Sequence, residues 1–383
     1  MSITGKIVNF LLKITSFLPR RNIIIFESSP NFSDNTYWFF KYLIENTDIS
    51  KKYKLVWMVK TEDEFRDTLC GQKIRCIART NMSTKNKFFY MYYYNFAKFI
   101  IDSNLYVEKQ HPAQKRIYLG HGMPLKSATE YVMQRGDVDM NMITTYYFND
   151  FFYKTGHTDN DLRNYGYPRN DILAKNAGIR KNRDVTNIVW MPTYRQHTKI
   201  SGMRIDYSFP LGIPVIKSAE DMKEINCHLK ENNTILYLRP HPAQDISMLK
   251  LEEMSNIIIA DTAYLESRNL QLYEFLAQTD ALISDYSSVY YDYLLLERPI
   301  ALAAEDLEEF CTKWPIVLKD LKANYRCEYI ETVDEMKSFI TDVASDEYKF
   351  MSDILREKKL YNDYTDGKSC ERIYNFMVKE YKL

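Results

Sequence analysis

Short apolar runs alternate with amphipathic stretches along most of the chain, and this pattern predicts an α/β protein. Runs of this kind are typical of strands that are buried on both faces of a parallel sheet. They lie at residues 22–26, 53–59, 98–102, 116–120, 187–191, 234–238, 256–260, 281–284 and 299–303. Stretches with the helical period, such as residues 37–46, lie between them. Because strands alternate with helices, we expect parallel sheets made of strand–helix–strand units.

The chain is longer than one hydrophobic core usually organises, which predicts two α/β domains within its 383 residues. Few apolar residues and several charges mark residues 176–187, and such a segment is typical of an interdomain linker. We therefore expect a first domain at residues 22–178, a second at 179–350 and a helical tail at 351–383.

The first 21 residues have the pattern of an amphipathic helix. Apolar residues recur on one helical face, whereas Lys6, Asn9 and Lys13 lie on the other. The lysines leave no apolar run long enough to span a bilayer, and Arg20 and Arg21 stand where a signal peptide would be cleaved. We expect this helix to lie in the plane of the cytoplasmic leaflet, with its positive charges on anionic lipid. The alternative is a helix that packs on the protein's own core.

Composition limits which partners the protein can bind and in which compartment it works. Lys plus Arg and Asp plus Glu are each 51, so no net positive field favours nucleic acid. The six cysteines include no pair with two-residue spacing, which argues against a zinc ribbon or a disulfide framework. The cysteine pattern favours a reduced, cytoplasmic setting.

A serine-rich turn follows the apolar run at 281–284 and predicts an anion site. Ser284, Asp285, Ser287 and Ser288 come where a helix over 289–296 can begin, with Ser287 or Ser288 as its N-cap. Free N–H groups and the positive end of the helix dipole favour an anion there, and the hydroxyls add donors. We expect a nucleotide diphosphate. The alternative is a capped helix with an Asx-type turn at Asp285.

Three further turns carry basic or imidazole side chains directly after predicted strands. His121 follows residues 116–120, Arg195 follows 187–191, and Arg239 and His241 follow 234–238. These side chains could lie close to the serine-rich turn. The carboxyl ends of strands border the ligand crevice in open α/β sheets, so the four turns are expected to form one site.

The order of these motifs resembles that of the CDP-glycerol glycerophosphotransferases, which build teichoic acids and related capsular polymers. The resemblance covers nearly the whole chain. The matching segments are Phe26-Glu-Ser28, Tyr53-Lys-Leu-Val-Trp57, His121-Gly-Met-Pro-Leu-Lys126, Gly166-Tyr-Pro-Arg-Asn-Asp171, Pro192-Thr-Tyr-Arg195, Arg239-Pro-His-Pro242, Ser284-Asp-Tyr-Ser-Ser288 with Arg298-Pro299, and Asp366-Gly367. Met123 and Gly120 depart from the family pattern, in which a small Thr and an aromatic residue are common at these places.

The resemblance implies a GT-B architecture, in which two Rossmann-like domains face a cleft. It places the donor nucleotide on the second domain and the acceptor on the first. The implied reaction is attack by an acceptor hydroxyl on the phosphorus that carries the glycerol of CDP-glycerol, with release of CMP. The implied acceptor is a lipid-linked glycan or a growing polyol-phosphate polymer at the cytoplasmic face of the membrane. A CDP-ribitol donor, and addition of one unit or of many, stay open.

The resemblance also implies roles for individual residues. His121 matches the histidine to which the family assigns the role of base, and flanking glycines let substrate approach its backbone. We expect His241 to donate to the diphosphate or to the departing CMP, and Arg239 to offer a planar fork for phosphate oxygens. The donor-binding set is Arg195, Arg239, Ser284, Asp285, Ser287 and Ser288, and further substrate contacts are expected from Gly122, Lys126 and Thr193.

Other readings of the sequence remain alternatives. Residues 137–139 and 159–161 each have the Asp-x-Asp outline of a metal motif, but neither follows an apolar strand, so we expect no essential metal and no cofactor. Arg169 and Asp171 are expected to pair with each other in a turn at the domain junction. A two-domain sugar transferase with a nucleotide-sugar donor is the second functional hypothesis. A non-catalytic scaffold of a polymer-export complex is the third.

Overall fold

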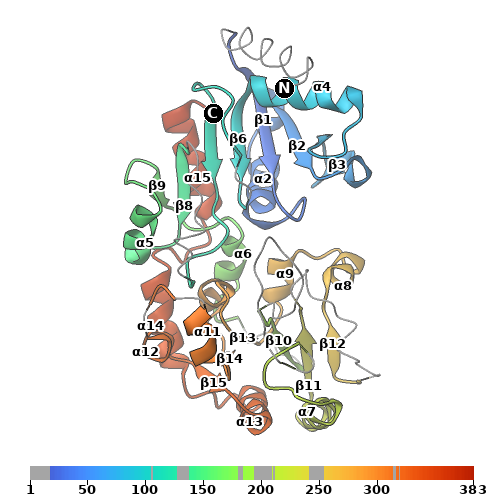
Figure 1. Ribbon diagram of the computed structural model, residues 1–383, viewed down its shortest axis with the longest axis vertical. Coiled ribbons are helices and arrows are strands. Elements are labelled where there is room, and N and C mark those ends of the chain that lie inside the picture. Colours follow the sequence, from blue (N-terminus) through green and yellow to red (C-terminus); the bar gives the residue numbers. More distant parts are fainter. Residues whose placement is uncertain are drawn as a thin grey trace. The chain divides into compact units, whose positions relative to one another are not determined.

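The computed structural model describes residues 18–104, 107–126, 138–179, 184–193, 209, 212–240, 254–313, 316–318 and 320–383 (Figure 1). Contacts between residues divide the chain into two compact units. The first unit consists of residues 1–121, 129–171 and 368–383, and the second of residues 122–128 and 172–367. The described chain therefore begins and ends in the first unit.

The first unit is built on a parallel sheet of seven strands in the order β5-β2-β1-β6-β7-β8-β9. The strands are β1 (Arg21–Glu27), β2 (Lys54–Val59), β5 (Arg75–Ala78), β6 (Ala97–Asp102), β7 (Lys115–Tyr118), β8 (Met140–Ile143) and β9 (Leu162–Asn164). A small hairpin of β3 (Thr68–Leu69) and β4 (Gln72–Lys73) precedes β5. The helices that begin in this unit are α2 (Asp34–Asn46), α3 (Ile49–Lys52), α4 (Thr84–Phe96), α5 (Asn149–Lys154), α6 (Asn170–Lys175) and α15 (Ser369–Tyr381).

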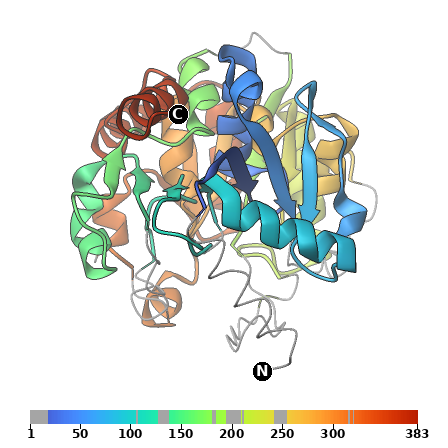
Figure 2. The same ribbon diagram turned by 90° about the horizontal axis from the view of Figure 1, so that it is seen from above.

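Burial explains why these apolar runs become central strands. The side chains from Ile23 to Phe26 are almost fully buried, because helices cover both faces of the sheet. Phe26, Phe40 and Trp57 join β1, α2 and β2 through ring contacts at centroid distances of 5.1 to 5.6 Å. Seen from above, α4 crosses the sheet (Figure 2).

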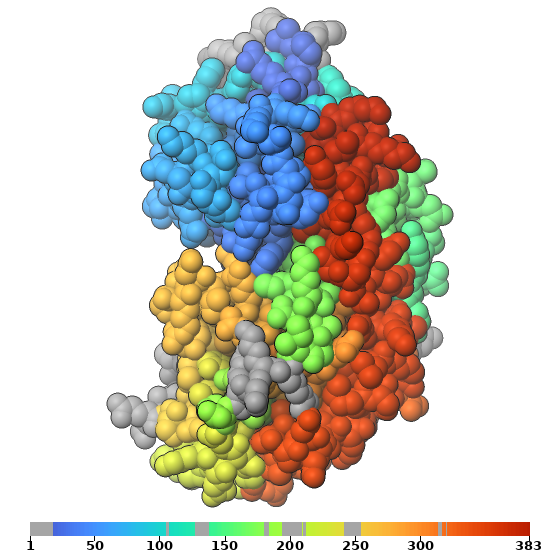
Figure 3. All heavy atoms as spheres, turned by 180° about the vertical axis from the view of Figure 1, so that it is seen from behind, coloured from blue at the N-terminus to red at the C-terminus, as the bar shows by residue number. Residues whose placement is uncertain are grey.

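The last helix of the chain completes the first unit. Tyr374 of α15 contacts Tyr42 of α2, and Phe376 of α15 contacts Tyr165 just after β9. Figure 3 shows the red α15 beside blue elements, in agreement with its contacts to α2. The predicted tail at 351–383 thus contains α14 (Met351–Tyr361), which the contacts assign to the second unit, and α15, which they assign to the first.

The second unit is built on a parallel sheet of six strands in the order β12-β11-β10-β13-β14-β15. The strands are β10 (Thr186–Trp190), β11 (Thr234–Leu238), β12 (Ile257–Ile259), β13 (Ala281–Ser284), β14 (Ile300–Ala303) and β15 (Glu328–Ile330). Its other elements include α7 (Ala219–Glu231), α8 (Thr262–Ser267), α9 (Leu272–Leu276), α10 (Val289–Tyr293), η4 (Leu294–Leu296), α11 (Leu307–Lys313), α12 (Leu321–Asn324), α13 (Val333–Ala344) and α14.

Both sheets have the strand order of a doubly wound α/β fold. The first strand of each sheet, β1 or β10, lies centrally. The strands that come next in the chain lie on one side of it, and the later strands lie on the opposite side. The strand order therefore reverses between β1 and β6 in one sheet and between β10 and β13 in the other. Ligands of such sheets bind outside the carboxyl ends of the strands at this switch point. Each unit thus offers one position for a site.

The sequence predicted the α/β class and nine of these strands correctly. The expected helix over 289–296 is also present, as α10 followed by η4. The contacts place the division at residue 171, whereas the sequence placed it at 178. The expected N-terminal helix falls mostly on residues 1–17, which lie outside the described residues. None of the described helices is long and apolar enough to cross a bilayer.

Candidate active site

His121 lies in the turn after β7, at the carboxyl edge of the first sheet. Gly120 before it has φ +76°. A Cβ atom at this position would lie 2.3 Å from Cε1 of Tyr167 and 3.1 Å from the carbonyl oxygen of Met142. The Tyr167 ring therefore occupies the space that a side chain at position 120 would need. Both the backbone conformation and this close approach require glycine.

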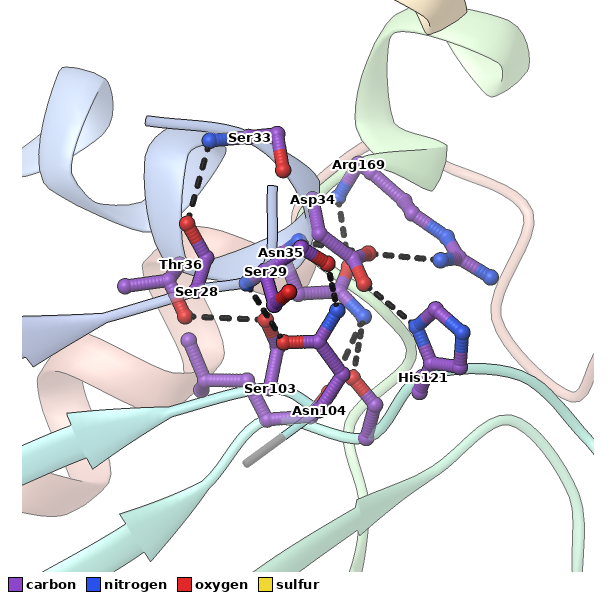
Figure 4. A network of polar contacts seen from close by, with 12 residues as sticks. Ser28, Ser29, Ser33, Asp34, Asn35, Thr36, Ser103, Asn104, His121 and Arg169 are labelled. Atoms are coloured by element: carbon purple, nitrogen blue, oxygen red, sulfur yellow. Dashed lines mark hydrogen bonds and ion pairs between the residues drawn. The ribbon is translucent and has the colours of Figure 1, made fainter. Parts of the chain in front are cut away.

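The imidazole of His121 is held by a carboxylate from the start of α2. Nδ1 of His121 lies 2.6 Å from Oδ2 of Asp34, and Oδ1 of Asp34 accepts a hydrogen bond of 2.6 Å from Nη1 of Arg169 (Figure 4). The His121 side chain is 63% exposed, whereas those of Asp34 and Arg169 are 7% and 6% exposed. An exposed imidazole ring thus contacts a buried ion pair. Asp34 contacts only the Nδ1 atom of this ring, not Nε2.

The charge of Asp34 is fixed by its neighbours. Burial by itself would raise the pKa of this carboxyl, but the Arg169 guanidinium and the His121 ring outweigh burial and hold that pKa well below its usual range. Asp34 is therefore ionised at neutral pH and acts only as a hydrogen-bond acceptor.

Asn35 fixes the three segments that meet at His121. Its Nδ2 donates to the carbonyl oxygens of Leu119 at 3.1 Å and Gly120 at 2.8 Å, and its Oδ1 accepts from the backbone N–H of Arg169 at 3.0 Å. Asn35 is fully buried. The start of α2, the turn after β7 and the turn after β9 are thereby locked together.

Polar groups at the switch point of the first sheet lie in the same network. The backbone N–H of Ser29, after β1, donates to Oδ1 of Asn104, after β6, at 2.8 Å. Beneath them, the hydroxyls of Thr36 and Ser103 lie 3.0 Å apart (Figure 4). Ser29 is exposed. The carboxyl edge therefore carries polar, partly exposed groups as well as His121, which suits a substrate rich in hydroxyls.

A buried carboxylate also organises the switch point of the second sheet. Asp285, after β13, is fully buried, and its Oδ2 accepts from the backbone N–H of Thr193, after β10, at 2.8 Å. The Thr193 hydroxyl donates to Oδ1 of the same carboxylate. Asp285 thus ties together the two turns at which the strand order reverses, and it holds Thr193 at that edge.

The serines of the expected anion site differ in exposure. Ser284 is fully buried and donates its hydroxyl to the carbonyl oxygen of Met191 at 3.4 Å, so it is engaged with backbone. Ser287 and Ser288 are half-buried. Ser288 occupies the N-cap position of α10, but its hydroxyl caps nothing, and α10 has only five residues. This turn can therefore bind an anion mainly through hydroxyl and N–H groups, because a helix of five residues has only a small dipole.

Arg239 lies after β11, next to β10 in the same sheet. Its backbone N–H donates to the Trp190 carbonyl at 2.8 Å, and its Nη1 donates to the carbonyl oxygen of Ala260 at 2.6 Å. Burial lowers the pKa of Arg239, and the carboxylate of Asp261 opposes that shift. The remaining guanidinium N–H groups have no further partner among the described residues. Arg195 and His241, its expected companions, lie outside those residues.

Two other expected substrate contacts, Gly122 and Lys126, lie among the described residues. Gly122 follows His121 with φ +152°. Lys126 bridges to Ile316 through backbone, and its Nζ lies 5.3 Å from the centre of the Phe310 ring. Substrate contact by these two residues stays a prediction.

The expected pairing of Arg169 with Asp171 is wrong. Arg169 pairs with Asp34. Asp171 accepts from the backbone N–H groups of Ser369 at 2.7 Å and Cys370 at 3.0 Å, at the start of α15. A carboxylate at a helix N-terminus is stabilised by the free N–H groups there, so Asp171 serves the attachment of α15.

The acidic motifs considered for metal are engaged with side chains of the protein. Asp139 pairs with Lys109 at 2.9 Å and Lys115 at 2.7 Å, and Asp161 contacts Nδ1 of His157 at 2.5 Å. Within the described ranges, no three or more His, Cys, Asp or Glu side chains gather where they could hold a metal ion. Independence from metal remains a prediction.

Two parallel sheets with polar groups at both switch points define a doubly wound α/β protein, and comparison with known proteins identifies the family. The family described as CDP-Glycerol:Poly(glycerophosphate) glycerophosphotransferase matches residues 10–379, so the chain belongs to this family. It is an enzyme of the CDP-glycerol glycerophosphotransferase class. The resemblance inferred from the sequence motifs is thereby confirmed.

Individual relatives agree with this assignment. The chain is 25% identical over 345 residues to a teichoic acid poly(glycerol phosphate) polymerase of Bacillus spizizenii, with 80% of each chain covered. It is 23% identical over 411 residues to a teichoic acid glycerol-phosphate transferase of Staphylococcus aureus, covering 96% of this chain and 95% of the relative. A solved structure of the wall teichoic acid polymerase TagF superposes with a TM-score of 0.72 at 19% identity, over 99% of this chain and 95% of that one. The last likeness shows the fold.

Proposed function

We propose that the protein transfers glycerol phosphate from CDP-glycerol to a hydroxyl of a lipid-linked or growing polyol-phosphate or glycan acceptor, releasing CMP. The pathway would be teichoic acid or capsule synthesis. The observation that carries this proposal is the exposed His121 ring, which a buried carboxylate holds at the carboxyl edge of the first sheet. The family and the names of the relatives support the donor.

In this proposal His121 is the general base. Its Nε2 takes the proton of the acceptor hydroxyl while that oxygen forms a bond to the phosphorus that carries the glycerol. The bond between this phosphorus and the bridging oxygen breaks, and CMP leaves with that oxygen. A base placed in this way is commonly worth about 10²- to 10⁴-fold in rate.

The donor would bind at the switch point of the second sheet. Arg239, whose remaining guanidinium N–H groups have no partner among the described residues, would hold diphosphate oxygens, and Ser287 and Ser288 would add hydroxyls. Asp285 would act indirectly by holding Thr193. Arg195 and His241 complete the expected donor set. This assigns the acceptor to a first domain and the donor to a second, facing each other across a cleft as in the GT-B architecture.

The choice of donor has a direct test. With a glycerol-phosphate-primed acceptor present, we expect CMP to be released from CDP-glycerol, and little to be released from CDP-ribitol. Chromatography measures the CMP. A faster reaction with CDP-ribitol would shift the assignment to ribitol phosphate transfer. UDP release from a nucleotide-sugar would favour the sugar transferase instead, and failure to bind any nucleotide would favour the scaffold.

We also propose that the protein works at the cytoplasmic face of the membrane, where a lipid-linked acceptor would be found. Residues 1–17 carry the apolar stripe and the lysines of the expected amphipathic helix. The residues that follow belong to the first unit, because the Arg20 guanidinium lies over Phe96 and Arg21 donates to the Tyr92 hydroxyl at 2.6 Å. A deletion that tests the anchor should therefore stop before Leu18.

Deletion of residues 2–17 should release the enzyme from anionic vesicles and lower activity on a lipid-linked acceptor, while activity on a short soluble acceptor persists. The deleted stripe supplies apolar area, and each lysine near an anionic surface contributes about 1 kcal/mol. Vesicle sedimentation measures the release. As a matched control, replacing Lys6 and Lys13 with glutamine should weaken binding mainly at low salt, because salt screens only the charged part. Full co-sedimentation of the deletion variant would mean that another surface contacts the membrane.

A further inference from the structure

We propose that Asp34 is a positioning residue for the reaction: it fixes the His121 ring in the tautomer that leaves Nε2 free to accept a proton, and Arg169 holds Asp34 in place. This inference rests on the proposed role of His121 as the base. It adds two residues to which no motif in the sequence assigned a part in the reaction.

The geometry divides the two oxygens of Asp34 between two partners. Oδ2 lies 2.6 Å from Nδ1 of His121, and Oδ1 lies 2.6 Å from Nη1 of Arg169. A neutral imidazole carries one proton, and the hydrogen bond made by one ring nitrogen decides which nitrogen keeps it. An ionised carboxylate can only accept, so Nδ1 must donate to Asp34. Nε2 then keeps its lone pair, on a side chain that is mostly exposed.

Arg169 ensures that this carboxylate stays ionised and stays turned toward His121. A buried carboxylate without a cation would tend to take up a proton, and a protonated Asp34 could donate to Nδ1 and stabilise the opposite tautomer. Arg169 is itself buried, and its backbone is held by Asn35. When His121 accepts the hydroxyl proton on Nε2, the ring becomes a cation, and Asp34 stabilises the positive charge.

The backbone conformation at Asp34 limits which residues can stand at this position. Its φ is +58°, in the left-handed region that few residues other than glycine, asparagine and aspartate adopt without strain. Its own Oδ1 also accepts from the backbone N–H of Asn35 at 2.8 Å. Of the residues that tolerate this backbone, only aspartate also brings a negative charge beneath the histidine.

Asp34→Asn is the sharpest test, because asparagine keeps the shape and tolerates the backbone conformation. We expect CMP release with acceptor to fall by about 10²- to 10⁴-fold, as for loss of the base itself, with CDP affinity unchanged. In ¹⁵N spectra of histidine-labelled protein, the His121 signals should show the proton on Nδ1 in the natural protein and a shift toward the Nε2 proton in Asp34→Asn. The His121 signals are assigned by their loss in His121→Ala. Wild-type turnover, or an unchanged tautomer, in Asp34→Asn would overturn the proposal.

A matched control lies in the same unit. Asp161 contacts Nδ1 of His157 at 2.5 Å, in a His–Asp pair of the same chemistry outside the candidate site. Asp161→Asn should leave the His121 signals and the rate of CMP release near those of the natural protein. An equal loss of rate in both variants would mean that removing any such pair damages the unit, and the specific role of Asp34 would fall.

The double variant separates this proposal from the proposed function. If Asp34 acts through His121, Asp34→Asn should cost nothing further in a His121→Ala background, because residues that work as a unit are not additive. A further large loss there would overturn the positioning role. If His121→Ala alone kept normal turnover, the proposed base would be wrong, whereas the tautomer measurement would still report on the contact with Asp34.

A rescue experiment covers the case in which Asp34→Asn fails to fold. Glycine adopts φ near +58° freely, so Asp34→Gly removes the carboxylate without backbone strain. Added formate can then occupy the vacated space between His121 and Arg169. We expect formate to raise the activity of Asp34→Gly severalfold and to leave His121→Ala unchanged. Equal response of both variants, or no response of Asp34→Gly, would count against a carboxylate at this place.

Discussion

Replacing His121 with alanine should lower the rate of CMP release in the presence of acceptor by about 10²- to 10⁴-fold, the usual contribution of a general base. CDP affinity should change little, because His121 belongs to the first unit and the expected donor residues lie on the second. Chromatography of CMP gives the rate, and calorimetric titration with CDP gives the affinity.

The control for this variant is His111→Ala. His111 precedes β7, whereas His121 follows it, so the two histidines mark opposite ends of the same strand. Nδ1 of His111 accepts from the backbone N–H of Ala113 at 2.9 Å, a contact within its own turn. His111→Ala should therefore retain turnover. Near-normal CMP release by His121→Ala would remove His121 from the chemistry, and a large loss of CDP affinity would place it at the donor instead.

Replacing Arg239 with alanine should weaken CDP binding and slow transfer together. A hydrogen bond to a charged group commonly contributes about 1.5–3 kcal/mol, which corresponds to a change in Kd of about 10- to 150-fold. Arg239→Lys should recover only part of this loss, since an ammonium group keeps the charge but lacks the planar fork. Titration with CDP and the kinetics of CMP release measure the two effects, and His241→Ala is expected to behave in the same direction.

Arg268→Ala is the matched control for Arg239. Arg268 lies on the same unit, is exposed, and stacks its guanidinium over Tyr264 at 3.7 Å from the ring centre. Its removal should leave CDP affinity unchanged. Because Nη1 of Arg239 donates to the Ala260 carbonyl, the thermal stability of each variant must be compared as well. Unchanged CDP affinity in a folded Arg239→Ala protein would place the donor elsewhere.

The strands that the sequence predicted are those with dense apolar runs, and those that it missed are short edge or near-edge strands. β5, β8, β9 and β15 have between three and four residues each, and charged or amide side chains interrupt their apolar pattern. Arg75, Asn141 and Glu328 are examples. Strands at or near the border of a sheet need less apolar surface, so hydrophobic periodicity alone does not reveal them.

The candidate site could be predicted only in part. Turns after strands were visible because a basic or hydroxyl side chain directly followed an apolar run. Asp34 was not visible, because 87 residues separate it from His121 and 135 separate it from Arg169. Its only local signal is its place in Ser33-Asp34-Asn35, which is equally typical of an ordinary helix start. Pairing over such separations comes from the strand order, which the sequence leaves open.

The position of α15 has a consequence for the order in which the protein folds during synthesis. Domains generally fold as they leave the ribosome, with the N-terminal one first. Here the first unit needs α15, whose start binds Asp171 and whose Tyr381 hydroxyl donates to the Asp139 carbonyl at 2.9 Å. At about 5–20 residues per second, residues 172–367 take roughly 10–40 s to emerge. The second unit is thus complete while the first still exposes the apolar surface that α15 will cover, and the unit that carries His121 is finished only after residues 368–383 have been made.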